Sequence, residues 1–350
     1  MDYKKAGVDI DAGNEVVRRI KGLARGTSRP GVLSDLGSFG GLFHMAAAGR
    51  RDPVLVASAD GVGTKLRVAF MSGIHGTVGI DLVNHCVNDI LVQGATPLFF
   101  LDYLATGRLD PDVAVQVVEG LSRACRDNGC ALLGGETAEM PGFYADGEYD
   151  IAGFIVGSVE RERLIDGRAI APGDALIGLP SSGLHTNGYS LARSIVFDRL
   201  QLKVHDRVPE LGATVADVLL APHRSYLPLI GPLLASGRIK GMAHITGGGI
   251  TENLPRVLPP GTEAVVRPES WETPPVFRWL QAAGAVSRED MFRTFNMGIG
   301  LVLVVAAADA EGVLGALRAA GESGATPIGV IAAGPSHVRY DGWGQTPRHP

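Results

Sequence analysis

The sequence predicts a two-domain protein of the α/β or α+β class, with helices packed on one face of a mixed sheet. Its 350 residues exceed the usual size of one hydrophobic core, and a hydrophobic content of 45% is enough to fill two. Between residues 53 and 160, short apolar strand segments alternate with longer amphipathic helical segments. Glycines cluster between these segments, which indicates many tight turns. We expect domains over residues 1–168 and 169–350.

The charge and hydropathy of the chain argue against two classes of partner. The net charge is −5 and no run of Lys and Arg forms a basic patch, so we expect no binding to nucleic acid. Residues 1–14 lack the apolar segment of a signal peptide. The longest apolar run, residues 297–308, is shorter than the roughly 20 residues that span a bilayer. We therefore expect a cytoplasmic protein with no membrane association.

Hydrophobic periodicity predicts the elements of the first half. A helix over residues 11–25 places Val16, Ile20 and Leu23 on one face and basic side chains around the other. The elements expected after it are strand 53–58, helix 78–93, strand 97–105, helix 110–128, and strands 130–133 and 149–159.

The second half is expected to begin with a strand over residues 174–180, which follows a Pro-Gly-Asp turn. A helix should start near Tyr189, and glycines 247–249 should join a strand to a helix. Asn296 comes immediately before a glycine-punctuated run that predicts a buried strand.

The cysteines give no sign of a disulfide or metal site. Cys86, Cys125 and Cys130 are odd in number, and their spacing fits no zinc motif. We expect three buried thiols.

The stretch from residue 57 to 65, ASADGVGTK, is the strongest candidate for charged chemistry, because a predicted strand runs there into a turn. Gly61 and Gly63 let backbone N–H groups approach an oxyanion. Asp60 can bind a hard cation, and Lys65 can offset negative charge. This combination suits a metal-bound polyphosphate. A strand-ending turn with a solvated acid is the alternative interpretation.

The predicted helix 78–93 has an unusual polar face. Its polar arc consists of Asp81, Asn84, His85, Asn88 and Asp89. The arc contains no Lys or Arg, although solvated helix faces are usually rich in them. Its composition suits coordination of Mg²⁺ or hydrogen bonding to a nucleotide better than it suits solubility.

Three further loops carry candidate groups. Two glycines at the end of a predicted strand indicate a turn, and Glu136 and Glu139 follow them. Paired carboxylates on a glycine turn resemble a second metal arm, with an acidic surface loop as the alternative. The loop 181–188 places small donors at a helix start, which suits an anion, and its His185 could act as a base. A plain capping loop explains this segment equally well. Glycines within residues 37–41 form a third loop that could lie against phosphate.

Several familiar motifs are absent from the sequence. It contains no Gly-Lys dipeptide and so no Walker A loop, and it contains no His-Glu-x-x-His, Cys-x-x-Cys or Gly-x-Ser-x-Gly motif. If the protein uses ATP, it binds the nucleotide with another architecture.

The chain resembles the phosphoribosylformylglycinamidine cyclo-ligase family over essentially its whole length. The strings that carry the resemblance are GVDIDAGNEVVRRIKG, DGVGTKLR, GIDLV, CVNDILVQGATPLFFLDYLATG, GGETAEMPG, YDIAGF, SSGLHTNGYSL, HITGGG and FNMGIG. The resemblance implies a two-domain α+β fold shared with thiamine-monophosphate kinase and selenophosphate synthetase. It also implies a homodimer in which the N-terminal sheets of two subunits pair and ATP lies near the interface.

The resemblance also implies roles for individual residues. Acids that hold Mg²⁺ would be Asp60, Asp89 and Glu136. ATP would be bound or covered by Lys21, Gly40, Gly41, Asp60, Gly61, Gly63, Thr64, Lys65, Asp81 and Asn88. The substrate would contact Ser182, Gly183, His185, Asn187, Gly248 and Gly249. His185 and Lys65 would be catalytic, with His185 as general base. The sequence departs from the family pattern at Ser38, where glycine is frequent, and at Asn84-His85, where some members have Ala-Met.

The reaction implied is the ATP-dependent closure of formylglycinamidine ribonucleotide to aminoimidazole ribonucleotide, a step of purine biosynthesis. Phosphorylation of the formyl oxygen would make it a leaving group, and the substrate's amidine nitrogen would then close the ring. Phosphoryl transfer depends mainly on positioning and charge neutralisation, so Mg²⁺ and backbone donors would carry most of the step.

Two other functions fit parts of the sequence. A small-molecule kinase of the same superfamily would share the carboxylates but not the substrate loops of the second half. A nucleotide-binding regulatory protein without turnover would be expected to have lost some of the acids, and all of them are present.

Overall fold

The computed structural model describes residues 10–34 and 40–343. The chain forms two compact units, one combining residues up to 164 with residues 185–227, and the other combining residues 165–184 with residues from 228 onward. The segment 185–227 thus packs with the first unit, although it follows the predicted boundary at residue 168. The assignment of ATP binding to residues 1–168 and of substrate closure to residues 169–350 stays a prediction.

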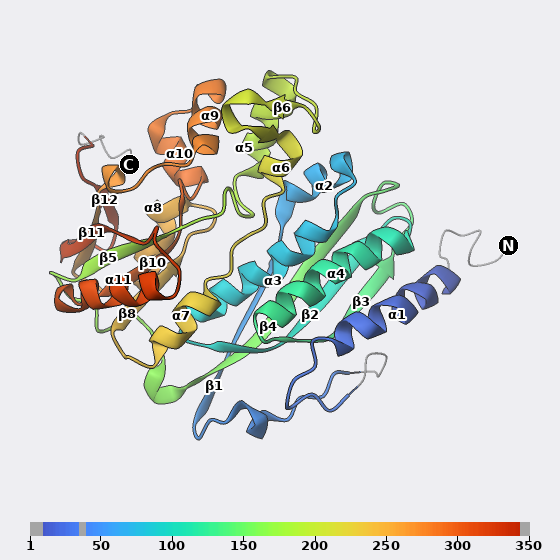
Figure 1. Ribbon diagram of the computed structural model, residues 1–350, viewed down its shortest axis with the longest axis horizontal. Coiled ribbons are helices and arrows are strands. Elements are labelled where there is room, and N and C mark those ends of the chain that lie inside the picture. The colour runs from blue at the N-terminus through green and yellow to red at the C-terminus, as the bar shows by residue number, and fades with distance from the viewer. Residues whose placement is uncertain (1–9, 35–39, 344–350) are drawn as a thin grey trace. The chain divides into compact units, whose positions relative to one another are not determined.

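The first unit is built on a four-stranded mixed sheet. Its strands, in spatial order, are β1 (Pro53–Gly61), β4 (Tyr149–Glu160), β2 (Thr96–Thr106) and β3 (Ala131–Glu139). β2 and β3 run parallel, and the other neighbouring pairs run antiparallel. One face of the sheet is covered by α3 (Gly76–Leu91), α4 (Pro111–Asp127) and α1 (Ile10–Arg25) (Figure 1). The predicted mixed sheet covered by helices is confirmed.

The two central helices pack unusually closely because glycines face each other. A Cβ added to Gly120 of α4 would lie 2.0 Å from the carbonyl oxygen of Gly76, and one added to Gly79 of α3 would lie 2.2 Å from that of Val117. α4 is also well capped at its start, where the Asp110 carboxylate accepts hydrogen bonds from two backbone N–H groups of the first turn. The close contact fixes α3, which carries the polar arc.

Strand β3 is longer than the sequence predicted, and this corrects the interpretation of the glycine pair. The parallel pairing with β2 continues through Gly134 and Gly135 to Glu139. Glu136 and Glu139 therefore lie on a strand, not on a turn. The reason is close approach, because a Cβ at Gly135 would lie 2.3 Å from a carboxylate oxygen of Asp102 on β2.

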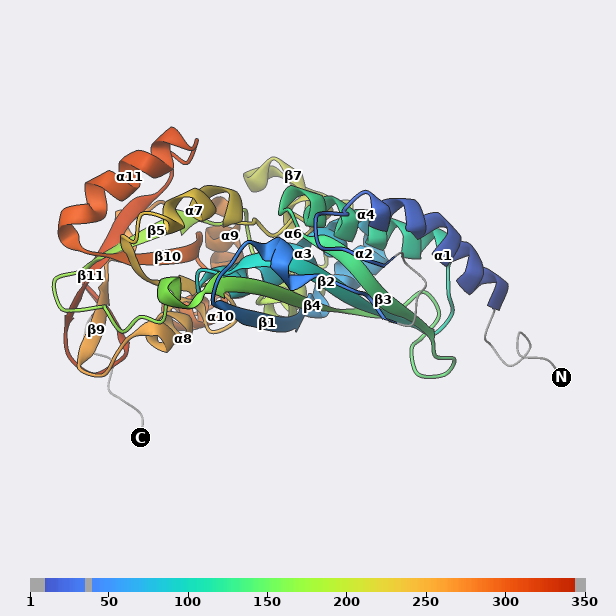
Figure 2. The same cartoon turned by 90° about the horizontal axis from the view of Figure 1, so that it is seen from below.

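The second face of this sheet is apolar and exposed. Leu55 of β1 and Phe154 of β4 are 56% and 45% exposed. Leu101 of β2 is the cross-strand neighbour of Phe154 and is also partly exposed. Figure 2 shows α1, α3 and α4 on the opposite side of the sheet.

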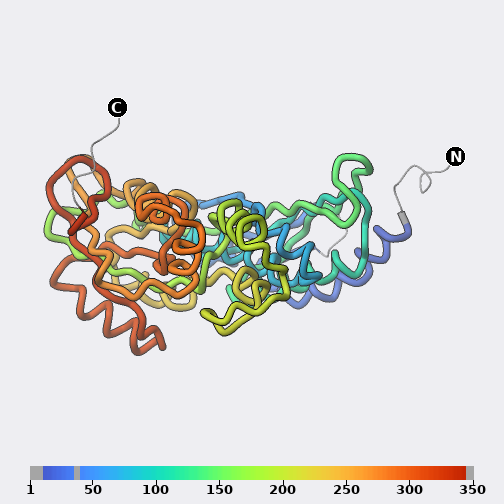
Figure 3. The backbone as a smooth tube through the Cα atoms, turned by 90° about the horizontal axis from the view of Figure 1, so that it is seen from above, coloured from blue at the N-terminus to red at the C-terminus, as the bar shows by residue number. Residues whose placement is uncertain are grey.

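The segment 185–227 forms a small subdomain of the first unit. It contains α5 (Tyr189–Arg193), the short strands β6 (Arg207–Val208) and β7 (Ala213–Thr214), and α6 (Val215–Leu219). Its helices contact the turn after β1 and the helix α2 (Leu66–Ser72), and Figure 3 shows this yellow-green segment beside the blue one. Two stretches more than a hundred residues apart in the chain are thereby joined.

The second unit contains a six-stranded mixed sheet. Its strands, in spatial order, are β12 (Val338–Tyr340), β9 (Thr262–Val266), β11 (Thr326–Ala333), β5 (Ala175–Pro180), β10 (Ile299–Val305) and β8 (Ile239–His244). Its helices are α7 (Leu227–Leu234), which starts at the junction with the first unit, α8 (Gly249–Asn253), α9 (Pro275–Gly284), α10 (Arg288–Thr294) and α11 (Ala310–Ala319). β10 is buried along its whole length, which confirms the predicted buried strand after Asn296.

Two further properties bear on the sequence predictions. Cys86, Cys125 and Cys130 are buried free thiols, as predicted. Among the residues described, no helix is both long enough and apolar enough to cross a membrane.

The glycine contact between α3 and α4 gives a stability prediction. Gly120→Ala is expected to destabilise the protein by about 1–3 kcal/mol, because the new methyl group would collide with the Gly76 carbonyl. Gly22, inside α1, is a matched control, since an added Cβ there meets no atom within 4 Å. Gly22→Ala should stabilise by about 0.5–1 kcal/mol through helix propensity alone. Denaturant unfolding measures both, and equal effects of the two substitutions would contradict the packing argument.

Candidate functional site

Asp60 and Asp89 converge where β1 ends against α3. The Asp60 carboxylate accepts a hydrogen bond of 2.7 Å from the backbone N–H of Gly61, and the Ser58 hydroxyl donates one of 3.0 Å to Asp89. His85 lies between the two acids, with its Nε2 atom 2.7 Å from Asp60 and 3.7 Å from Asp89. The Asp60 and Asp89 side chains are 44% and 24% exposed. Two partly exposed carboxylates held in this way can bind a hard divalent cation.

His85 sets the electrostatics of this carboxylate pair. Burial lowers the pKa of His85, but its hydrogen bond to Asp60 and the charges of both acids outweigh burial, so the net pKa is raised. Burial raises the pKa of Asp60, but the His85 hydrogen bond and charge outweigh that effect, so its net pKa is lowered. Each group therefore favours the charged form of the other, the carboxylate of Asp60 and the imidazolium of His85.

Lys65 and Asp81 form a fully buried ion pair in the same unit. The Lys65 ammonium lies 2.8 Å and 2.9 Å from the two oxygens of Asp81. It also donates to the backbone carbonyls of His185 at 3.1 Å and of Ala221 at 2.9 Å. Burial lowers the pKa of Lys65 and raises that of Asp81, and their mutual attraction opposes both shifts. All three ammonium donors are used within the protein, so this lysine connects three segments of the chain.

The polar arc of α3, for which the sequence predicted contact with Mg²⁺ or a nucleotide, is covered by other parts of the chain. Asn88 donates to the carbonyl of Arg224 at 2.8 Å and accepts from the N–H of Tyr226 at 2.9 Å. Asn84 donates to the carbonyl of His223 at 2.7 Å. Asp81, Asn84, His85 and Asn88 are all buried. Most of the arc therefore binds the backbone of residues 223–226. The proposed contacts of Lys65, Asp81 and Asn88 with triphosphate stay predictions.

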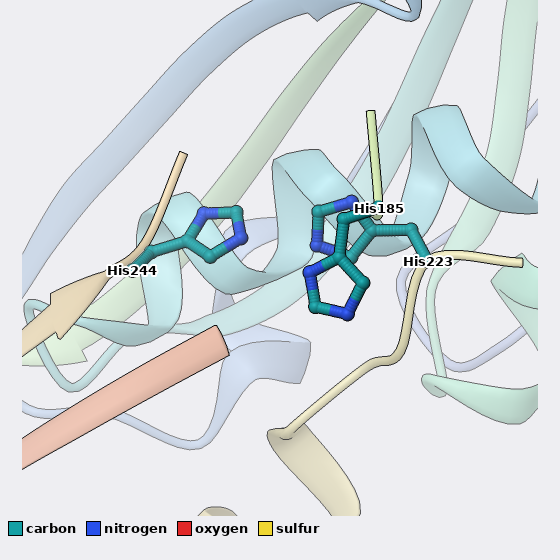
Figure 4. Close-up of side chains that lie close together, drawn as sticks. All are labelled: His185, His223 and His244. Atoms are coloured by element: carbon teal, nitrogen blue, oxygen red, sulfur yellow. The ribbon is translucent and has the colours of Figure 1, made fainter. Parts of the chain in front are cut away.

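A hydrogen-bonded chain of side chains links Asp60 to the 185–227 segment. Thr186 Oγ1 lies 2.7 Å from Nδ1 of His85 and 3.3 Å from Nδ1 of His223. The His185 ring is buried and stacks on that of His223 with a centroid distance of 3.9 Å (Figure 4). His244, also drawn there, belongs to the second unit. Sequence reasoning missed His223, because its segment has no periodicity or motif.

A cavity of about 670 Å³ lies at the other edge of the first sheet. It is lined by α1, β2, β3 and the predicted loop glycines Gly40 and Gly41. Its charged lining consists of Asp102 and Glu136, and most of the remaining side chains are apolar. Lys21 is exposed on α1, while Gly37 and Ser38 lie outside the described residues. The cavity thus brings together Gly40 and Gly41, which were predicted to bind ATP, and Glu136, which was predicted to bind metal.

Glu136 is separated from the other two predicted metal ligands within one chain. The cross-strand register runs from Asp60 to Gly153, then to Asp102, and then to Gly135, the neighbour of Glu136. Three strand spacings amount to about 14 Å. A single chain therefore presents two acidic positions, Asp60 with Asp89 at one sheet edge and Glu136 at the other.

The predicted substrate residues are divided between the two units. His185 and Asn187 belong to the first unit, whereas Ser182 and Gly183 belong to the second. Asn296 holds the latter loop, because its amide donates to the Gly183 carbonyl at 2.8 Å.

Gly248 and Gly249, also in the second unit, begin helix α8 with positive φ angles of 95° and 61°. A Cβ at Gly249 would lie 1.9 Å from the Phe292 carbonyl oxygen, so this glycine is required for packing against α10. Contacts of these residues with substrate stay predictions.

Comparison with family models places the chain among the AIR synthase related proteins. The model of their N-terminal domain matches residues 44–159, and that of their C-terminal domain matches residues 171–342. A phosphoribosylformylglycinamidine cyclo-ligase from Trichlorobacter lovleyi is 59% identical over 320 residues, which are 91% of this chain and 92% of the relative. The enzyme of that name from Myxococcus xanthus is 56% identical over 333 residues, 95% of this chain and 96% of the relative. The chain belongs to the phosphoribosylformylglycinamidine cyclo-ligase family, as the sequence motifs predicted.

Solved structures show that the fold is shared more widely. Thiamine-monophosphate kinase from Stenotrophomonas maltophilia aligns with a TM-score of 0.67 at 19% identity, over 94% of this chain and 96% of that chain. The hydrogenase maturation protein HypE in complex with ATP aligns with a TM-score of 0.63 at 19% identity, over 93% of this chain and 90% of that chain. At this identity the likeness concerns the fold.

The buried ion pair yields a prediction about the structural role of Lys65. Lys65→Met and Asp81→Asn should each destabilise the protein by about 3–5 kcal/mol, because each leaves a buried charge without its partner. The double variant should lose clearly less than the sum, since it leaves neither charge. Denaturant unfolding of the four proteins gives the coupling energy. Additive losses would show that the pair does not stabilise the unit.

Proposed function

We propose that this chain catalyses the ATP-dependent closure of formylglycinamidine ribonucleotide to aminoimidazole ribonucleotide, with release of ADP and phosphate. The main support is the identity of 59% with a named cyclo-ligase over nearly the whole length of both chains. The converging carboxylates of Asp60 and Asp89 agree with this chemistry, because ATP enters such reactions as a metal complex.

The chemistry requires an amide oxygen to become a leaving group. The formyl oxygen attacks the γ-phosphorus of ATP, which forms an oxygen–phosphorus bond and releases ADP. The amidine nitrogen then attacks the same carbon, the carbon–oxygen bond breaks, and phosphate and one proton leave. Each step depends on holding the reacting atoms in line, so the protein acts chiefly by positioning.

The described residues divide this work between them. Asp60 and Asp89 would hold Mg²⁺, which when bound would neutralise charge on the ATP phosphates. Ser58, His85 and the Gly61 N–H orient the two carboxylates. His185 remains our candidate for the group that accepts the proton, although its ring is buried against His223.

The cavity between α1 and β3 is proposed to bind the nucleoside part of ATP. Val17, Ile20 and Leu133 give it apolar walls suited to a planar base. Its two acidic lining residues, Asp102 and Glu136, offer no positive charge to a bare triphosphate. The neutral end of the nucleotide therefore fits it better than the phosphates do.

We further propose that the protein is a homodimer and that each active site uses two chains. The apolar face with Leu55 and Phe154 is suited to burial against a second copy. Glu136 lies too far from Asp60 in one chain to share an ion with it, and pairing of two sheets offers a second chain to supply it. The cytoplasmic location expected from the sequence stays a prediction.

An isotope experiment tests the proposed reaction. Substrate labelled with heavy oxygen in its formyl group should yield one labelled phosphate for each ring closed, with ADP formed in equal amount. Mass spectrometry of the phosphate provides the measurement. Label found in water would rule out the phosphorylated intermediate, and absence of any turnover with this substrate would overturn the proposed function.

A complementation experiment tests the two-chain site. Asp60→Asn and Glu136→Gln should each lower kcat by roughly 100-fold or more while keeping the melting temperature. If the acids of one site come from different chains, a heterodimer of the two variants has one site with no substitution. Randomly mixed and reassembled chains should then regain about a quarter of wild-type activity. Failure to recover, with heterodimers verified by a different affinity tag on each variant, would show that the two acids do not meet across two chains.

A further inference from the structure

The carboxyl group of Asp102 has no role in the mechanism above, yet glycines on both neighbouring strands lie beside it. Asp102 lies in the middle of β2, paired with Gly153 on one side and Gly135 on the other. The missing side chain at Gly135 leaves the space that its carboxylate oxygen fills. Within the described part of the chain, the Asp102 carboxyl group accepts a hydrogen bond from the backbone N–H of Asp102 itself. The group is therefore placed to bind something outside the protein.

The surroundings of Asp102 indicate what that ligand is. The group lines the cavity of about 670 Å³ beside α1, with apolar side chains around it. Among the described residues, Cys125 on α4 is the titratable group that interacts with the Asp102 charge. Tyr103 and its cross-strand partner Glu136 also line the cavity, but they point to the other face of the sheet. None of these is basic, so a phosphate or carboxylate would find no counter-charge here. A neutral ring with polar edges is the class of ligand that fits.

The protonation state of Asp102 determines which ring it can recognise. Burial raises the pKa of this carboxyl group to about 7. A protonated carboxyl group donates one hydrogen bond and accepts another, which matches the ring nitrogen N1 and the 6-amino group of adenine. An ionised carboxylate only accepts, which matches the N1–H and 2-amino groups of guanine and opposes the lone pair of adenine N1.

We propose that Asp102 is the residue that selects adenine, by hydrogen bonding through a neutral carboxyl group to the edge of the base that carries the 6-amino group. The inference rests on the proposed use of ATP and deepens it by naming the group that reads the base. Glu136, the other acid of the cavity, lies on the neighbouring strand and is not assigned this role.

The test compares the affinities for ATP and GTP. Because the two nucleotides carry the same triphosphate, effects of pH on the phosphates and on the metal cancel in the ratio of the affinities. Equilibrium binding of each nucleotide to the full-length protein is measured with Mg²⁺ at pH 6.0 and pH 8.5. As pH rises through the pKa of Asp102, the neutral form falls from most of the population to a few per cent. The preference for ATP over GTP should therefore fall roughly 10- to 30-fold across this range.

Two variants of Asp102 sharpen the test. Asp102→Asn keeps a donor and an acceptor and cannot ionise, so it should retain the preference for ATP at both pH values. Asp102→Leu should weaken ATP binding at both and remove most of the discrimination. Glu136→Gln is the matched control, because it changes the other cavity acid and should leave the pH-dependent fall in preference intact.

The outcomes separate this inference from the proposed function. A wild-type preference for ATP that does not change between the two pH values would overturn the role of Asp102, and this result needs no variant to fold. Equal nucleotide preference in the wild type and in Asp102→Leu would overturn it as well. If ATP does not bind at all, the proposed function fails together with it, whereas turnover with unchanged selectivity removes only this inference.

Discussion

The buried ion pair of Lys65 and Asp81 is the interaction on which the first unit depends. Removing two charges from water costs several kcal/mol for each ion, and the attraction between them offsets this only when their remaining hydrogen bonds are made. Those bonds come from other segments, because the Lys65 ammonium needs the carbonyls of His185 and Ala221, and Asp81 also accepts from the N–H of His223 at 2.6 Å. The pair therefore requires the 185–227 segment to be in place, and that segment in turn fixes α3 and the acids beside it.

Local periodicity was sufficient to predict most of the fold from the sequence. The helix predicted at 11–25 is observed as α1, and the strand predicted at 149–159 is observed as β4. Asp60, Asp89 and His85 were identified because acids and imidazole stand out at a strand end and on a helix face. Their convergence depends on how α3 packs against β1, which no single segment encodes.

Two features were predicted wrongly because each local sequence pattern is compatible with two different structures. The absence of Lys and Arg from the polar arc of α3 was read as a ligand site, but it equally describes polar groups that bind buried backbone, as Asn84 and Asn88 do. Adjacent glycines were read as a turn, whereas Gly135 allows one strand to approach another. Asp102 drew no attention in the sequence, since its environment is created by α1 and β3, which lie far from it along the chain.

The discontinuous make-up of the first unit has a consequence for how the protein is made. The hydrogen bond between Asp81 and His223 joins residues 142 positions apart. At a synthesis rate of 5–20 residues per second, about 7–28 seconds pass between the appearance of the first residue and that of the second. Throughout this interval the polar arc of α3 has no cover, although all four strands of the first sheet are made before the interval ends. The first unit can complete its fold only after part of the second unit, residues 165–184, has emerged from the ribosome.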